Sequence, residues 1–87
     1  MHDAPGRSTL TTFVTSFYRW LLRRADRDDP VGAVARAAAQ DPAWPTRTDA
    51  LPRLDRYLRG RGATLETRRA LRRAYGEWLI ATAGEVR

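Results

Sequence analysis

The segment Ser16-Phe17-Tyr18-Arg19-Trp20-Leu21-Leu22 decides the fold of this chain, because it places apolar side chains at helical spacing. The same period continues upstream, so that apolar residues recur at positions 10, 13, 14, 17, 18, 21 and 22. Recurrence at i, i+3, i+4 and i+7 is typical of an amphipathic α-helix. The sequence therefore predicts a first helix that runs from Leu10 to the acidic stretch at 26–29.

A second helix is predicted from Val31 to about Gln40. Asp29-Pro30 places an N-cap residue before a proline at the first helical position, and Asp41-Pro42 ends the helix because a residue before proline avoids the α region. The face expected to be buried consists of small residues: Val31, Val34, Ala35 and Ala38.

Trp44 stands between two prolines and must lie in an irregular segment. Such a tryptophan is either a core residue at a corner of the chain or an exposed recognition residue. We expect the core position.

Two more helices follow. Thr48 or Asp49 is expected to cap the third, which tolerates Pro52 in its first turn and ends at the glycines of 60–62. Its predicted apolar face is Leu51, Leu54, Tyr57 and Leu58. Thr64 is expected to cap the last helix, whose predicted stripe is Leu71, Ala74, Tyr75, Trp78, Leu79 and Thr82.

Length and composition predict one small domain. The chain has 87 residues and no cysteine, so burial of apolar surface must stabilise it without disulfides or a cysteine zinc site. We expect a flexible tail over 1–9 and one helical domain over 10–84. The sequence has no apolar run of membrane-spanning length and no order typical of a signal peptide, which favours the cytoplasm.

The positive charge is concentrated in one part of the chain. All 16 basic residues are arginine, and the net charge is +6. Between positions 53 and 73 there are eight arginines against Asp55 and Glu66, which accounts for the whole excess. A GC-rich coding source explains the absence of lysine, and the placement of the arginines is the more informative feature.

The order of the aromatic motifs resembles the YozE-type family of small bacterial proteins, which has a SAM-like (sterile alpha motif-like) helical fold. The resemblance rests on the 16–21 segment, on Trp44-Pro45, on Tyr57-Leu58 and on Leu71 and Tyr75 with Trp78 or Leu79. The chain departs from the family in its arginine-dense 53–73 segment, in Thr46 where lysine is usual, and in the residues that precede Ser16.

The resemblance implies an all-α, compact four- to five-helix SAM-like bundle in the cytoplasm of a bacterium, and little about activity. The residues expected to anchor its core are Phe17, Tyr18, Leu21, Trp44, Tyr57, Leu58, Leu71, Tyr75 and Trp78. SAM-like folds in general mediate contacts with proteins and in some cases with nucleic acids, which is an analogy of fold alone.

No motif indicates catalysis. His2 lies in the predicted tail without a partner, and the hydroxyl residues have no base to activate them. Counted from Asp26, a calcium loop would need glycine and a bidentate acid where Val31 and Ala37 stand. The 60–62 segment lacks the further glycine and the strand of a dinucleotide loop. We therefore expect a protein that is not an enzyme, with no catalytic residue, metal, cofactor or small-molecule substrate.

Two binding hypotheses remain. In the first, the protein binds another protein or a copy of itself, with Trp20 as the candidate contact residue because it lies at the edge of its helical stripe. The alternative for Trp20 is packing against the last helix. In the second, the 53–73 segment binds the phosphate backbone of a nucleic acid. The arginines that would form such a surface are Arg59, Arg61, Arg68, Arg69, Arg72 and Arg73; the alternative is a solvated arginine face that results from codon bias.

Overall fold

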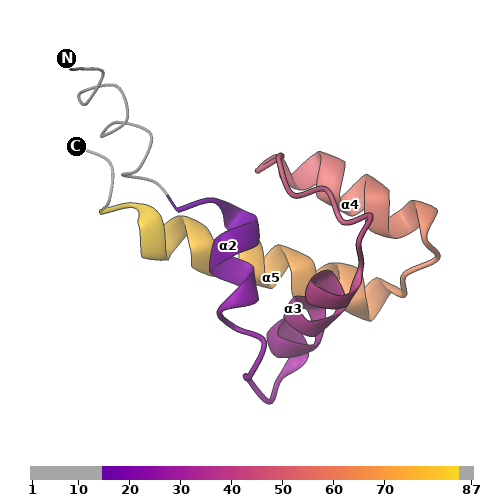
Figure 1. The fold of residues 1–87 in the computed structure, drawn as a ribbon, viewed down its shortest axis with the longest axis horizontal. Coiled ribbons are helices and arrows are strands. Elements are labelled where there is room, and N and C mark those ends of the chain that lie inside the picture. The colour runs from indigo at the N-terminus through magenta and orange to yellow at the C-terminus, as the bar shows by residue number, and fades with distance from the viewer. Residues whose placement is uncertain (1–14, 85–87) are drawn as a thin grey trace.

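The computed structural model describes residues 15–84, and it places four helices and no strand in that range (Figure 1). The helices are α2 (Phe17–Leu22), α3 (Pro30–Gln40), α4 (Leu51–Gly60) and α5 (Leu65–Thr82). The predicted all-α fold class is confirmed. The predicted tail over 1–9, its boundary at residue 10 and the first residues of the predicted first helix lie outside the described residues.

The first helix of the described chain begins at Phe17, so the prediction of one continuous helix from Leu10 is wrong. Ser16 has an extended backbone, and its hydroxyl accepts a hydrogen bond from the Arg19 N–H at 3.2 Å. Ser16 is therefore an N-cap. Apolar periodicity alone does not detect such a helix start. The helix also ends early, at Leu22, and a turn leads to α3.

The α3 helix forms where its caps predict. Asp29 Oδ1 accepts from the Gly32 N–H at 2.9 Å, and Pro30 occupies the first turn. Gly32 is buried against the turn before the helix. A Cβ at this position would lie 1.9 Å from the carbonyl oxygen of Arg27, so only glycine allows the two backbones to approach this closely.

Neither residue expected to cap α4 does so. The N-cap is Ala50, which makes no side-chain bond, and Thr48 Oγ1 accepts from the Ala50 N–H at 3.1 Å. Asp49 instead accepts from the Phe17 N–H at 3.0 Å, which satisfies the first free donor of α2. Asp49 therefore caps the start of α2, although it is adjacent in sequence to α4.

The α4–α5 connection follows its sequence signals. Gly62 has a positive φ of 79°, a conformation that favours glycine. Thr64 caps α5 as predicted, with its hydroxyl accepting from the Thr67 N–H at 3.1 Å.

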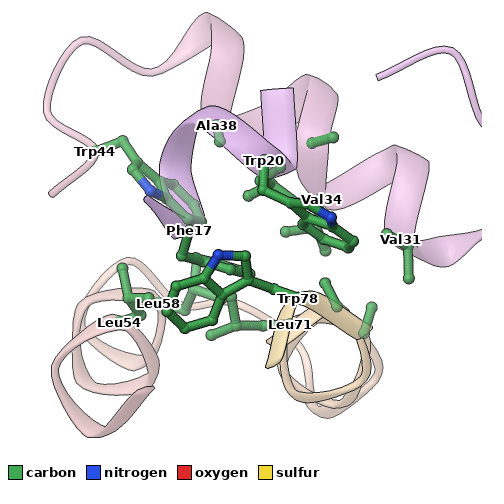
Figure 2. Packing of buried hydrophobic residues seen from close by; sticks show 14 residues of the cluster. Phe17, Trp20, Val31, Val34, Ala38, Trp44, Leu54, Leu58, Leu71 and Trp78 are labelled. Carbon is green, nitrogen blue, oxygen red and sulfur yellow. The ribbon is translucent and has the colours of Figure 1, made fainter. Parts of the chain in front are cut away.

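Helix α5 is the centre of the fold, because it contacts α2, α3 and α4, while α2 and α3 also contact each other (Figure 1). Figure 2 shows the buried side chains of all four helices and of Trp44 converging on one interior. Six of the expected anchors are buried, and Tyr18, Tyr57 and Tyr75 are half-buried against them. The buried anchors are Phe17, Leu21, Trp44, Leu58, Leu71 and Trp78.

Phe17 lies at the centre of the aromatic packing. Its ring centroid is 5.4 Å from that of Tyr75, 5.7 Å from that of Trp78 and 6.2 Å from that of Trp20. The Trp78 indole N–H donates to the Thr15 carbonyl at 2.7 Å, which fixes the chain where it enters α2.

The predicted apolar face of α5 included one residue too many near the C-terminal end of the helix. Leu79 is 50% exposed, so the expectation that it is part of the core is wrong. In this part of α5 the buried face is formed by Ala74, Trp78 and Thr82, and Leu79 lies beside that face.

Candidate interaction surface on helix α4

Trp20 is not available as an exposed contact residue. It is only 5% exposed, its ring stacks near Phe17, and the Arg24 guanidinium lies 4.2 Å from its ring centroid. The physical reason is that α2 is covered by both α3 and α5, so a residue at the edge of its stripe is still enclosed. Trp20 therefore belongs to the core.

Two of the candidate arginines join α4 to α5. Arg68 donates from Nε and Nη2 to the two carboxylate oxygens of Asp55, each at 3.0 Å. Arg72 Nη2 lies 3.8 Å from the same carboxylate, which is only 13% exposed. These contacts, the hydrogen bonds from Arg68 first, hold the pKa of Asp55 below its ordinary value. We call this set, Asp55 with Arg68 and Arg72, the α4–α5 seam.

Arg61 belongs to a second cluster. Its guanidinium lies 5.5 Å from the Tyr57 ring centroid and 3.7 Å from an Asp41 carboxylate oxygen. The Tyr57 hydroxyl donates to the other Asp41 oxygen. This hydrogen bond lowers the pKa of Asp41 and raises that of Tyr57.

Arg73 is engaged at the far side of α5. Its Nε lies 3.4 Å from Glu77, which also accepts from Arg27 at 2.6 Å. Arg27 in turn binds Asp29, so this network ties α5 to the start of α3. The hydrogen bond from Arg27 is the main cause of the lowered pKa of Glu77. Of the six candidate arginines, Arg59 and Arg69 alone form no ion pair within residues 15–84.

The free positive charge lies instead on the outer face of α4. Positions 53, 56 and 59 are spaced by three residues, opposite the buried Leu54 and Leu58. We define the α4 arginine surface as Arg47, Arg53, Arg56 and Arg59. All four side chains are exposed, and none has an ion-pair partner in the part of the chain that the structure describes.

An open groove runs between α4 and the segment that precedes it. Its lining contains three of these arginines and no acidic residue: Pro45, Thr46, Arg47, Thr48, Arg53, Arg56 and Tyr57. A second hollow lies against α4 and α5, and its lining includes Arg56, Arg59 and Arg72 together with the acidic Asp55. Arg56 borders both, so the arginine surface continues from one hollow to the other.

The wall of the groove opposite α4 is anchored at both ends. Trp44 is 4% exposed, and its ring meets that of Tyr57 edge to face at 5.9 Å. At the other end, the Tyr75 hydroxyl donates to the Asp49 carbonyl at 2.5 Å, while the Asp49 side chain binds α2. The groove is therefore set by the core rather than by a loop free to move.

Arg47 lay outside every sequence-based hypothesis, whereas Arg53 and Arg56 were included in the 53–73 segment but were not singled out as contact residues. The sequence does contain a signal for this surface, because residues 53, 56 and 59 lie on the helix face opposite Leu54 and Leu58. What the sequence could not show is that Asp55 lies within reach of α5, since that contact depends on how the two helices cross. A count of charges along 53–73 therefore could not distinguish the arginines of the seam from the arginines that form no ion pair.

Two further observations concern chemistry and membranes. Within residues 15–84, no three histidine or acidic side chains come together as a metal-binding group. In the same range, no helix combines the length and apolar character needed to cross a bilayer.

Comparison with known proteins places the chain in a family. Residues 16–79 match the family model described as "YozE SAM-like fold". No curated protein and no solved structure matches. The matched range contains every helix from α2 to α4 and most of α5. Because the match covers well over half of the sequence, this chain belongs to the YozE SAM-like family.

Proposed function

We propose that this protein is a non-enzymatic binding module that binds an acidic segment of a partner protein through the α4 arginine surface. One observation carries the proposal: three of the four exposed arginines without ion pairs in residues 15–84 line a groove whose lining holds no acidic residue, and Arg59 lies in the neighbouring hollow. Guanidinium groups bind carboxylates in a planar, two-point geometry, and arginine is enriched in protein interfaces.

Charge also bears on which partner fits. A second copy of this chain docked through the same surface would bring arginines against arginines, and like charges across an interface cost affinity. An acidic partner removes that cost. We therefore favour a different protein over self-association at this surface.

The proposal includes a cytoplasmic location in a bacterium, which the resemblance to small bacterial proteins supports. Fractionation of cells that express the chain with a tag would test this part.

The test is binding of a fluorescent acidic peptide, measured by polarisation at about 50 and 150 mM salt. Arg53→Glu with Arg56→Glu should weaken binding at least about tenfold, because two attractive charges become repulsive. Arg19→Glu with Arg23→Glu is the matched control: both are exposed arginines of the α2 region, and the same change in net charge should leave affinity within about threefold.

Circular dichroism must show that both double variants are folded. Equal losses in the two variants would mean that net charge alone attracts the peptide, and the proposed surface would be wrong.

A second candidate, binding to a nucleic-acid backbone, is favoured by the row of Arg53, Arg56 and Arg59 along one convex helix face. Contacts from such a row to phosphates would make affinity fall steeply with salt. The test is a titration with duplex and single-stranded DNA. No binding below about 100 μM near 50 mM salt would exclude it, because non-specific affinities reach about 10⁻⁴–10⁻⁶ M even at physiological salt.

A further inference from the structure

We infer that the groove between residues 45–48 and α4 binds an extended peptide in which an apolar side chain lies between acidic residues. This inference rests on the proposed function, and it names the pattern that the partner must carry. It commits to a peptide of a partner protein; nucleic acid is an outcome of the test.

The composition of the two walls carries the inference. The segment before α4 contributes Pro45 and Arg47, and α4 contributes Tyr57 with Arg53 and Arg56. Each wall thus combines an apolar surface with cationic donors. An occupant therefore meets guanidinium groups from both segments together with the apolar surfaces of Pro45 and Tyr57, a combination that is complementary to carboxylates that flank an apolar side chain.

The apolar part of the groove is held in place before any partner arrives. Tyr57 packs edge to face on buried Trp44, its hydroxyl is bound by Asp41, and Arg61 covers its ring. A wall that is already ordered loses little conformational entropy on binding. The polar atoms of the groove are also suitable, because the Thr46 and Thr48 hydroxyls can bond the backbone of an extended peptide.

A nucleic acid would use the surface differently. A phosphate backbone needs the convex row of arginines, including Arg59, and it needs no apolar wall. Arg59 does not line this groove but the neighbouring hollow. A variant that fills the groove without changing charge therefore separates the two ligands.

The experiment compares two labelled peptides that carry the same acidic residues and differ at the central position, leucine in one and serine in the other. Affinities are measured by polarisation with the full chain. The Thr46→Trp variant fills the groove at constant charge, and Ala81→Trp adds the same side chain to an exposed position of α5 as the control.

We expect the leucine peptide to bind at least about fivefold more tightly than the serine peptide, since part of the leucine leaves water. Thr46→Trp should remove this preference and weaken the leucine peptide about tenfold or more. Ala81→Trp should behave as the unmodified chain. Thermal unfolding of each variant shows that the fold is kept.

The outcomes separate the inference from the proposed function. If both peptides bind equally and Thr46→Trp changes neither, while Arg53→Glu with Arg56→Glu abolishes binding, the groove inference is overturned and the proposed function stands. If neither peptide binds the unmodified chain, both are overturned. If duplex DNA binds more tightly than either peptide and Thr46→Trp leaves that binding intact, the ligand is a nucleic acid and the inference fails.

Discussion

The α4–α5 seam and the α4 arginine surface both place arginine side chains beside helix α4, yet these arginines have different environments. In the seam, Arg68 binds both oxygens of an Asp55 carboxylate that is largely enclosed. On the outer face, Arg53 and Arg56 form no ion pair within residues 15–84. One side of α4 therefore uses its charge to hold a neighbouring helix, and the other side keeps its charge available to a partner.

This difference separates stability from binding. Changes in the interior or in the seam should alter the free energy of unfolding, and changes on the outer face should alter affinity while the fold persists. Each of the following predictions tests one side of that division.

The largest effect should come from the interior that supports both regions. Trp78→Ala should lower the free energy of unfolding by about 3–5 kcal/mol, because it removes a buried ring beside Phe17 and Tyr75 and leaves a cavity. Urea unfolding followed by circular dichroism measures the loss. Trp78→Phe keeps a ring and should lose clearly less; equal losses would mean that the hydrogen bond from the indole to the Thr15 carbonyl, which both variants remove, stabilises the fold more than the packing of the ring.

A smaller effect is expected at the contact between α3 and the preceding turn. Gly32→Ala should cost about 1–3 kcal/mol, because the new Cβ would overlap the Arg27 carbonyl and the backbone must shift. Gly76→Ala is the matched change in α5, where a Cβ meets no atom within 4 Å. It should stabilise the protein by about 0.5–1 kcal/mol, since alanine favours the helix. If both variants changed the free energy of unfolding in the same direction, the close approach of the backbones at Gly32 would be contradicted.

The seam and the outer face can be compared directly. Arg68→Ala should lower the urea midpoint, because it leaves the enclosed Asp55 carboxylate without its main partner. Arg53→Ala with Arg56→Ala should leave the midpoint unchanged, since neither side chain has an ion-pair partner in the described residues. A drop of similar size in both would mean that the outer arginines are also structural.

Acid should weaken the seam and spare the outer face. The folded-state pKa of Asp55 lies below its ordinary 3.8, so the unfolded chain takes up this proton first as the pH falls. The stabilisation is complete above about pH 3.8 and is lost as the pH drops through the lowered folded value. The pKa values of Asp41, Asp29 and Glu77 are also lowered in the folded protein, so these carboxylates change stability with pH in the same direction.

Urea midpoints between pH 5 and pH 2 measure this dependence. The midpoint of the unmodified chain should fall toward low pH, and that of Asp55→Asn should fall by less. An unchanged pH dependence in Asp55→Asn would show that the seam carboxylate is not preferentially stabilised in the folded state.

Features that depend on local sequence were predicted well. The Asp29 and Thr64 caps, the positive φ in the 60–62 turn and the burial of Trp44 follow from residue chemistry within a few positions. The family resemblance over most of the chain rests on the same local motifs.

Features that depend on how helices cross were not predictable. Asp49 could not be assigned to the start of α2 from its position beside α4, because the contact spans 32 residues. Leu79 was misassigned for a related reason: periodicity ranks residues around one helix, but it does not say which of them the neighbouring helices cover. The same ambiguity left two alternatives open for Trp20, and its burial agrees with the one in which it packs in the core. The candidate surface shifted from the 53–73 segment to 47–59 because Asp55 and Asp41 engage Arg61, Arg68 and Arg72, which the sequence had left free.

The most direct test of the central claim is a map of the bound surface. Backbone amide signals of the uniformly ¹⁵N-labelled chain should be followed by NMR during titration with the leucine-containing acidic peptide. The account predicts the largest shifts at residues 45–48 and 53–59, with the interior around Phe17 and the seam residues Arg68 and Arg72 little changed. Shifts centred on α2 or α3, or spread evenly over all exposed arginines, would contradict the claim that the outer face of α4 is the binding surface.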